Sequence, residues 1–311
     1  NLAMSGKGTM TGLAGTEDNV YTANVNTDGN EVIAPVESEI TLQNGSTTLT
    51  LPAYSLTVLK LEISDGNVDV TMGDSLVGAY TFDDAEAPLD NSASDAEGSE
   101  AVVVDKENNL AEVEEAFTYV TDRNGGQAAS FDGTTTGNAL KLDTAFTGNA
   151  QTISFWMNTT AYTDWTSAFF AYDPDNNNYV NIMPQGWGDT SLNPQYAEGT
   201  DGLISKTAGA EGGLNVGEWH MVTFVIDGST ITIYKDGVAV QAFQDTVFAD
   251  TAAVTEGYLA TMTELYLGAN VYGDPLYNGA IDDVYLYNKA LTAEEVAALY
   301  GYIPSTGVTI D

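Results

Sequence analysis

Short runs of β-branched and aromatic residues, separated by pairs of turn-forming residues, recur along almost the whole chain. The runs are rich in Val, Ile, Leu, Thr, Tyr and Phe, the pairs are mostly Asp-Gly, Asn-Gly and Gly-Asn, and the chain holds 31 Gly and 8 Pro. Strands that return through tight turns are antiparallel, because a parallel neighbour needs a long crossover connection. The pattern therefore predicts an all-β protein of packed antiparallel sheets rather than an α/β enzyme.

Two local patterns are the clearest. Residues 223–240, TFVIDGSTITIYKDGVAV, predict a three-stranded meander with Asp-Gly turns at 227–228 and 236–237, which need positive φ. Near the end, LTAEEVAALY predicts the one short C-terminal helix, because Thr292 as N-cap and Glu295 three residues later form a capping box. Leu291 can pack on Val296 as a hydrophobic staple.

The N-terminal region forms a separate pattern. Between 39 and 63, EITLQ and TTLTL predict a hairpin through Asn44-Gly45, and SLTVLKLEI predicts a further strand. The polar stretch that follows contains two glycines and predicts a linker at 64–75. We therefore expect a first domain at 1–63 and a second, continuous domain at 76–301.

The charge of the chain excludes some classes of partner. Asp and Glu number 45 against 8 Lys and Arg, which gives a net charge of −37, and Arg123 is the one arginine. Nucleic acids and anionic membrane surfaces are excluded, because both are held by clustered cations. With no Cys, disulfides, thiol catalysis and zinc–thiolate sites are excluded as well.

A surface rich in Thr, Asn, Ser and Gly, with few cations, is typical of exported proteins, so we expect a secreted or bacterial cell-surface location. The first residues, NLAMSGKGTM, lack the charged start and apolar core of a signal peptide. We therefore expect any export signal to lie upstream.

Five motifs occur in order between 76 and 300: LVGAYTFDD with the loop DNSASDAEGS, GQAASFDG, QTISFWMN, VGEWHMVTFVIDGSTITIYKDG and NGAIDDVYLYNKALTAEEVAALY. In this order and spacing they resemble the laminin-G-like, concanavalin A-like jelly-roll family of bacterial surface proteins and glycosidases. The resemblance implies an antiparallel β-sandwich. It says less about function, because this fold carries many roles.

Two shorter resemblances concern the ends of the chain. EVIAPVESEITL and LPAYSLTVLKL, within 1–63, resemble the end of the C-terminal β-sandwich of glycoside hydrolase family 51 α-L-arabinofuranosidases. This resemblance implies a partial β-sandwich here and a catalytic domain upstream in the same parent chain. PSTGVTID resembles the opening strand of a bacterial immunoglobulin-like domain, so 302–311 is expected to lead into such a domain.

The laminin-G-like family often holds a structural calcium ion where its first and last strands meet. Carried onto this sequence, the resemblance implies Asp83, Asp90, Asp132 and Asp282 as ligands. An acidic, Asn- and Gly-rich chain supplies the oxygen ligands that calcium needs. The alternative for Asp90 and Asp132 is an ordinary turn residue whose carboxylate accepts local backbone N–H groups.

The signals for catalysis are weak. Glu-x-Asp-x-x-Glu, the string that carries the acids of β-sandwich glycosidases of this shape, does not occur. Glu294 and Glu295 fit the first turn of the helix, and Glu112, Glu114 and Glu115 are expected to be solvated. His220, the one histidine, is expected to be structural, because no Cys or second His completes a triad or metal site.

Sugar binding needs aromatic rings that stack on sugar faces, with amides and carboxylates for the hydroxyls. Two segments, 162–200 and 271–279, combine these residue types with loop-like composition, which favours a binding surface. The candidate residues are Trp165, Tyr172, Asp173, Asn177, Tyr179, Trp187, Tyr196, Tyr272, Asp274 and Tyr277. The alternative is that aromatic residues fill the core, as is expected of Trp156 and Trp219.

The chain is thus predicted to be a non-catalytic carbohydrate-binding region of a secreted, multidomain α-L-arabinofuranosidase. Its predicted partners are plant cell-wall polysaccharides that contain arabinose and the upstream catalytic domain. Two alternatives stay open, a structural spacer or adhesin module and a glycoside hydrolase with its own site in the jelly roll.

Overall fold

The computed structural model describes the strands at 7–14, 36–41 and 55–61, together with residues 69–93, 99–185, 191–197, 204–205, 212–244 and 258–302. The chain divides into two compact units between Val68 and Asp69. This division falls inside the linker predicted at 64–75. Each unit is described by itself.

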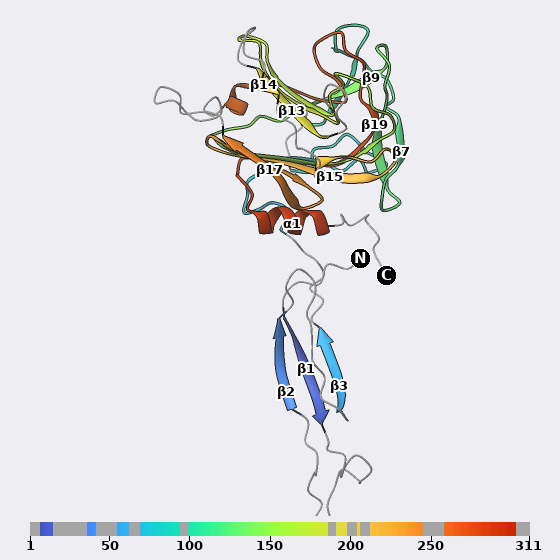
Figure 1. The fold of residues 1–311 in the computed structure, drawn as a ribbon. Helices are drawn as coiled ribbons and strands as arrows, with labels where there is room; N and C mark the ends of the chain where they lie inside the picture. The colour runs from blue at the N-terminus through green and yellow to red at the C-terminus, as the bar shows by residue number, and fades with distance from the viewer. Residues whose placement is uncertain are drawn as a thin grey trace, which may run out of the picture. The chain divides into compact units, whose positions relative to one another are not determined.

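The first unit contains a three-stranded antiparallel sheet in the order β2 (Val36–Thr41), β1 (Lys7–Ala14), β3 (Ser55–Leu61) (Figure 1). β2 and β3 overlap strands that the sequence predicts. β1 was not predicted, because its sequence KGTMTGLA contains two glycines and little β-branched character. The predicted TTLTL strand lies outside the described residues, so the hairpin through Asn44-Gly45 stays a prediction.

The second unit is a sandwich of two antiparallel sheets, each of eight strands. The first sheet has the order β17 (Val238–Gln244), β16 (Thr230–Lys235), β15 (Trp219–Asp227), β10 (Ala150–Thr159), β19 (Asn278–Tyr287), β8 (Gln127–Asp132), β7 (Tyr119–Thr121), and β4 (Leu76–Tyr80) pairs with the second half of β19. The second sheet has the order β14 (Ile204–Ser205), β13 (Asn193–Ala197), β12 (Asn178–Met183), β11 (Phe169–Asp173), β18 (Glu264–Leu267), β9 (Asn138–Leu142), β5 (Val102–Asp105), β6 (Ala111–Glu112). The predicted all-β sandwich is confirmed.

The main core lies between the two sheets. Alternate residues of each strand point inward, so that Phe155 of β10 stacks on Phe169 of β11 with ring centroids 6.4 Å apart. Each fully buried side chain of this size stabilises the fold by about 1.5–3 kcal/mol. A short 3₁₀ helix, Tyr258–Thr261, adds Tyr258 and Leu259 to this core.

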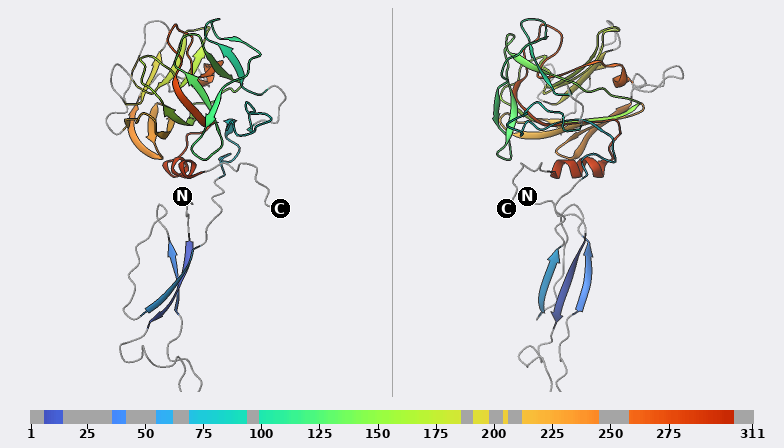
Figure 2. Two further views of the ribbon diagram at one scale, coloured as in Figure 1. Left: turned by 90° about the vertical axis from the view of Figure 1, so that its right-hand side faces the viewer. Right: turned by 180° about the vertical axis from the view of Figure 1, so that it is seen from behind.

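A second, smaller core covers the outer face of the first sheet. Helix α1 (Ala293–Gly301) lies against this face, and Val296 and Leu299 of the helix are buried there with Leu291 (Figures 1 and 2). The predicted capping box is confirmed, since the Thr292 side chain accepts from the Glu295 amide and the Glu295 side chain accepts from the Thr292 amide.

The predicted meander is also confirmed as β15, β16 and β17. Gly228, Asp236 and Gly237 in its two turns have φ of 55°, 51° and 78°, as the Asp-Gly pairs predict. The expectation for the tryptophans is corrected. Trp156 and Trp219 are half-buried, and Trp156 packs with the second core beneath α1, because its neighbours on β10 take the inward positions.

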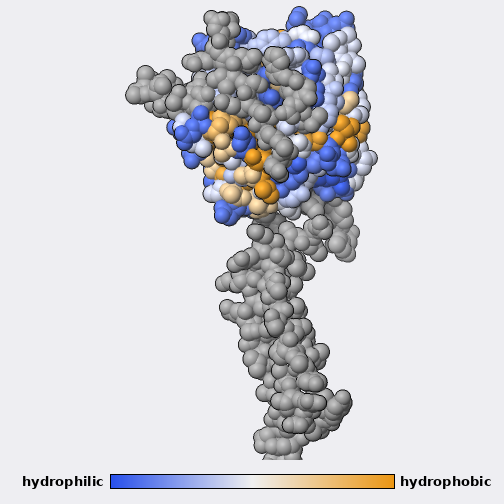
Figure 3. Space-filling model, viewed as in Figure 1, coloured by the Kyte–Doolittle hydropathy of each residue, from blue (hydrophilic) through white to orange (hydrophobic). Residues whose placement is uncertain are grey.

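Exposed apolar side chains of the described residues are scattered rather than continuous, and Figure 3 shows them as separate patches among hydrophilic residues. Such scattered residues are normal on a globular surface. Across the described part of the chain, no helix has the length and apolar character needed to cross a membrane.

Candidate functional site

Aromatic rings gather on the outer face of the second sheet. The register pairs Tyr172 of β11 with Tyr179 of β12, and Phe170 shares the face of Tyr172 because alternate residues of a strand point to the same side. Phe170 stacks on both tyrosines, with ring centroids 5.9 and 5.4 Å apart. Tyr272 meets Phe170 and Tyr179 edge-on at 6.1 and 5.8 Å. We call these four residues the ring cluster.

Tyr272 belongs to the loop between β18 and β19, residues 268–277, which we call the Tyr272 loop. Asn270, 1% exposed, organises this loop. Its Nδ2 donates to the Trp165 carbonyl at 3.1 Å, to Ser167 Oγ at 3.0 Å and to Asp274 Oδ2 at 3.1 Å, and its Oδ1 accepts from the Tyr272 amide at 2.9 Å. One buried amide therefore ties together the two loops that carry Trp165 and Tyr272.

A buried lysine supports the same loop. Lys106 Nζ donates to the carbonyls of Asn270 at 2.6 Å and Tyr272 at 2.5 Å. Burial lowers the pKa of the Lys106 amine, while the nearby Asp274 carboxylate raises it. The cation is thus used to hold backbone carbonyls whose removal from water would otherwise be costly.

A pocket of about 360 Å³ opens beside this loop, and we call it the Tyr272 pocket. It is lined by Lys106, Glu107, Asn109, Leu110, Thr135, Thr136, Asn270, Val271, Tyr272 and Gly273. Its size lies within the range of small-ligand sites, about 300–1,000 Å³. The side chains of Trp165 and Tyr272 are 37% and 41% exposed, so both rings can meet a ligand.

Six of the ten residues predicted for sugar binding meet around the ring cluster: Trp165, Tyr172, Asn177, Tyr179, Tyr272 and Asp274. The Tyr172 hydroxyl donates to Asn177 Oδ1 at 3.0 Å, and Asn177 itself has a φ of 56° in the turn between β11 and β12. The two predicted segments, about a hundred residues apart, thus come together at one place.

The other candidates lie elsewhere. Asp173 is buried and caps its own turn by accepting from the amides of Asp175 and Asn176. Tyr196 is a core residue that stacks on Phe243, and Tyr277 is fully buried, with its hydroxyl 2.9 Å from Thr159 Oγ1. Tyr196 and Tyr277 are corrected to core positions, because neither ring can reach a ligand.

Trp187 lies outside the described residues.

On the outer face of the second sheet, Asn181 pairs with Phe170 across the two strands and carries a buried Oδ1. This oxygen has no hydrogen-bond donor among the residues that the structure describes.

The phenols of Tyr179 and Tyr272 stay protonated at neutral pH. Burial, with smaller contributions from the nearby Tyr272 and Asp274, raises the pKa of Tyr179 to about 12. Burial also raises the pKa of Tyr272, with contributions from Tyr172 and Asp274. Both of these hydroxyls can therefore donate a hydrogen bond.

The four residues implied as calcium ligands have separate roles. Asp83 Oδ1 accepts from the Gln127 amide at 2.8 Å, and Asp282 Oδ2 accepts from Arg123 at 2.8 Å. Asp132 Oδ1 accepts from the amide and hydroxyl of Thr134, which is the turn role left open above, and Asp90 is exposed. Among the described residues, no group of three or more His, Asp or Glu side chains is arranged to hold a metal ion.

At Asp282 the counter-charge comes from the chain itself. Arg123 donates to Asp282 and to Asp283, which are 1% and 2% exposed, and its guanidinium lies 4.0 Å from the centre of the Trp156 ring. These oxygens are therefore already bound to a cation and do not fit a calcium ion in this arrangement. Calcium binding stays a prediction, which the melting temperature with calcium and with a chelator would test.

Burial raises the pKa of Asp282, and the charge of Asp283 raises it further. Burial likewise raises the pKa of Asp283, against the opposing effect of Arg123. Asp283 has a φ of 47° at the end of the NGAIDD motif, and its Oδ1 is buried without a hydrogen-bond partner in the described part of the chain. One guanidinium thus offsets only part of the cost of burying two carboxylates.

His220 is structural, as the sequence predicts. Its Nδ1 lies 2.8 Å from Asp236 Oδ2, and its Nε2 accepts from the Asn215 amide at 3.4 Å. Nδ1 is therefore the nitrogen that carries the proton in the neutral ring. The carboxylate of Asp236 also accepts from the Met221 amide, so this network fixes the turn between β16 and β17.

A family model described as "Concanavalin A-like lectin/glucanases superfamily" matches residues 131–297, a little over half of the chain. The chain belongs to this superfamily. A search of the curated proteins finds no match. The matched range includes the ring cluster, Asn270 and the whole Tyr272 loop.

Solved structures of the same architecture include domain 4 of AbnA, a GH43 extracellular arabinanase from Geobacillus stearothermophilus, in complex with arabinotriose. Its identity to this chain is 22%, its TM-score is 0.57, and the match covers 73% of this chain and 98% of that one. At this identity, the likeness shows that the two chains share the concanavalin A-like fold.

The ligand-binding domain of botulinum neurotoxin serotype D, in complex with N-acetylneuraminic acid, matches at 13% identity and a TM-score of 0.48. The binding domain of Paraclostridial Mosquitocidal Protein 1 matches at 13% and 0.47. The matches cover 74% and 73% of this chain, which spans about half of the length of either binding domain.

Sequence reasoning did not identify Asn270 or Lys106. Asn270 stands in GANVYGD, where a turn residue is the ordinary interpretation, and Lys106 follows the strand at 102–105 as a surface cation would. The scarcity of cations, 8 in 311 residues, was the one signal that could have singled out Lys106. Its partners lie about 165 residues away, so no local pattern reveals them.

Proposed function

We propose that the concanavalin A-like domain is a non-catalytic carbohydrate-binding module for arabinose-containing polysaccharide. The observation that carries the proposal is the pair of exposed rings, Trp165 and Tyr272, held by one buried Asn270 beside the Tyr272 pocket. Rings fixed in this way stack on the apolar face of a sugar without a large loss of side-chain entropy.

Hydrogen-bond donors and acceptors surround these rings. The Tyr272 hydroxyl is a donor, Asn177 and Asp274 supply an amide and a carboxylate, and Thr135 and Thr136 bring hydroxyls to the wall of the pocket. Sugar sites combine aromatic surface with a few convergent polar groups of this kind. The fold shared with an arabinanase domain that was solved with arabinotriose supports arabino-oligosaccharides as the first ligands to test.

The proposal extends to the parent protein. The resemblance of residues 1–63 to family 51 α-L-arabinofuranosidases supports an upstream catalytic domain, and the cation-poor composition supports a secreted or cell-surface location. A weak sugar contact joined to an enzyme raises the effective concentration of substrate near the catalytic site. The module then contributes to activity on polymer without chemistry of its own.

Isothermal titration of the full 311-residue chain with arabinotriose tests this function. Tyr272→Leu should weaken binding at least about tenfold, because it removes the exposed ring that can stack on a sugar. Tyr300→Leu is the matched control, since Tyr300 on α1 is also 41% exposed and lies on the other sheet. Equal affinity of both variants and the unmodified chain contradicts the assigned site.

Binding to no arabino-oligosaccharide or arabinan, with a folded chain by circular dichroism, contradicts the proposed function and favours the spacer or adhesin alternative. Release of sugar by the isolated chain, lost on substitution of a specific acid pair, favours the hydrolase alternative.

A further inference from the structure

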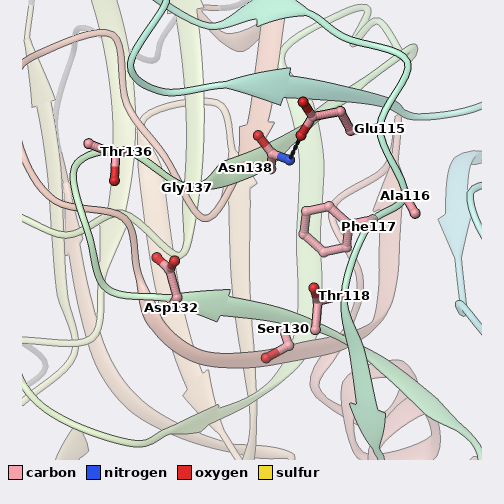
Figure 4. A pocket seen from close by; sticks show the side chains of 9 residues that line it. All are labelled: Glu115, Ala116, Phe117, Thr118, Ser130, Asp132, Thr136, Gly137 and Asn138. Atoms are coloured by element: carbon pink, nitrogen blue, oxygen red, sulfur yellow. Dashed lines mark hydrogen bonds between the residues drawn. The ribbon is translucent and has the colours of Figure 1, made fainter.

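A second cavity lies next to the Tyr272 pocket and shares one lining residue, Thr136, with it. It has a volume of about 280 Å³, and we call it the Asp132 pocket. Its lining residues are Glu115, Ala116, Phe117, Thr118, Ser130, Asp132, Thr136, Gly137 and Asn138 (Figure 4). It opens at the edge of the sandwich, because Ser130 and Asp132 end β8 of the first sheet while Asn138 begins β9 of the second.

The lining of the Asp132 pocket is chemically suited to a polyol. Figure 4 shows Asp132 and Thr136 on one side of the opening and Glu115, Phe117 and Thr118 on the other. Carboxylates, hydroxyls and the Asn138 amide supply acceptors and donors around the ring of Phe117, which is fixed edge-on to Phe131 at 5.4 Å. A half-buried ring with hydroxyl and amide groups around it matches one face and the rim of a sugar unit.

Each carboxylate keeps an oxygen for a ligand. Glu115 Oε2 accepts from Asn138 Nδ2 at 2.9 Å, and Asp132 Oδ1 accepts from the amide of Thr134 at 2.9 Å. The second oxygen of each group accepts no hydrogen bond from the part of the chain that the structure describes. Both side chains are exposed, so these oxygens are free to accept from sugar hydroxyls.

The two pockets adjoin at one loop. Thr136 lines both, and the loop at 133–137 that carries it lies between them. The loop is held from both sides, since the Leu276 amide donates to the Thr134 carbonyl at 2.7 Å and the Lys106 amide donates to the Gly137 carbonyl at 3.1 Å. The distance from Tyr272 to the second cavity is therefore fixed by hydrogen bonds rather than set by a ligand.

The geometry points to the Asp132 pocket as a second subsite, which takes a neutral sugar unit of the same oligosaccharide that contacts Tyr272. This inference rests on the proposed function. The lining contains two carboxylates and no cation, so a uronic acid unit would meet like charge at close range. The chain would then bind a stretch of several neutral units, with one end at the ring cluster and the other between Glu115 and Asp132.

Titration of the full chain with linear arabino-oligosaccharides of two to six units tests the inference. The affinity should rise about tenfold or more between the shortest oligomer that fills the Tyr272 pocket and the length that spans both pockets. Glu115→Ala should remove this gain for the long oligomers and leave the affinity for the short ones unchanged, because Glu115 lies in the second pocket alone.

Glu114→Ala is the matched control. Glu114 precedes Glu115, is also exposed, carries the same charge and does not line the pocket. Tyr272→Leu should weaken binding of every length. An affinity that does not depend on length in the unmodified chain, or a Glu115→Ala variant that behaves like Glu114→Ala, overturns the second subsite while the proposed function stands.

An oligogalacturonate of the same length is the second probe. It should bind at least about tenfold more weakly than the arabino-oligosaccharide, and equal or tighter binding overturns the assignment of a neutral unit. Absence of binding by the unmodified chain to any oligomer contradicts the proposed function itself, and this inference with it.

Discussion

On each outer face of the sandwich an outward-facing aromatic residue is covered, and the covering element differs between the two faces. Trp156 on the first sheet and Phe170 on the second are both outward-facing aromatic residues. Trp156 is covered by Tyr300 of α1, with ring centroids 5.4 Å apart, whereas Phe170 is covered by Tyr272 of a single loop. A helix with its own buried residues closes one face, while the loop leaves exposed rings and a pocket on the other.

A cation supports each face, and the partners of the two cations differ. Arg123 binds two buried carboxylates beside Trp156, whereas Lys106 binds two neutral backbone carbonyls of the Tyr272 loop. Removing a cation from buried carboxylates leaves uncompensated charge, while removing one from carbonyls leaves unpaired dipoles. The comparison therefore predicts two different results of removing the cation. On the helix-covered face the main loss is in stability, and on the face of the ring cluster it is in sugar binding.

The largest expected effect is that of Arg123→Met. The variant leaves Asp282 and Asp283 buried without their counter-ion, which should lower the free energy of unfolding by about 3–5 kcal/mol. Urea denaturation followed by circular dichroism measures this loss. Affinity for arabinotriose should be unchanged wherever the variant is folded. A loss below about 1 kcal/mol would show that the pair is not a structural contact of this face.

Lys106→Met should have a smaller effect on stability and a larger effect on binding. Two carbonyls of the Tyr272 loop lose a charged donor, which costs about 1–3 kcal/mol. Because the loop carries Tyr272, the affinity for arabinotriose should fall as well. Lys141→Met is the matched control, since Lys141 is more exposed and contacts Glu112 at 3.7 Å. Equal affinities of the two variants would contradict the role given to Lys106.

A further expected effect, spread over several pH units, is a pH dependence of stability that arises at the helix-covered face. Burial holds the pKa values of Asp282 and Asp283 above their unfolded values, so the folded state binds more protons than the unfolded chain. The free energy of unfolding should therefore fall as the pH rises above about 4, by at most about 1.4 kcal/mol per pH unit for each group. Asp83 and Asp122 raise both pKa values and act in the same direction.

Denaturant titrations between pH 4 and pH 8 measure this slope. Asp283→Asn should reduce the slope, because it removes one of the two titrations while the general charge repulsion of the chain is nearly unchanged. The same slope in Asp283→Asn and the unmodified chain would attribute the pH dependence to net charge alone.

The sequence predicted correctly those elements that depend on contacts between neighbouring residues. The capping box at Thr292 and Glu295 and the Asp-Gly turns at 227–228 and 236–237 depend on neighbours within a few residues, and each was predicted correctly. β1 was missed, because its glycine-containing sequence forms a strand by pairing with β2 and β3 rather than through its own propensity.

The site could be predicted only in part for the same reason. Residue type and loop composition gave Trp165, Tyr172 and Tyr272, but they could not separate these rings from Tyr196 and Tyr277, which have the same chemistry and lie in the core. Which face of a strand a ring occupies depends on register, and register is set by the partner strands.

The sequence by itself determined the class of the fold, the Asp-Gly turns of the meander and the helix at Ala293–Gly301. These follow from alternation, turn chemistry and helix capping, which are properties of the chain as written. Only the tertiary structure decided that Asn270 joins two loops, that Arg123 neutralises Asp282 and Asp283, and that Thr136 separates two pockets. Each of these depends on contacts between residues far apart in the sequence, which exist once both sheets have packed.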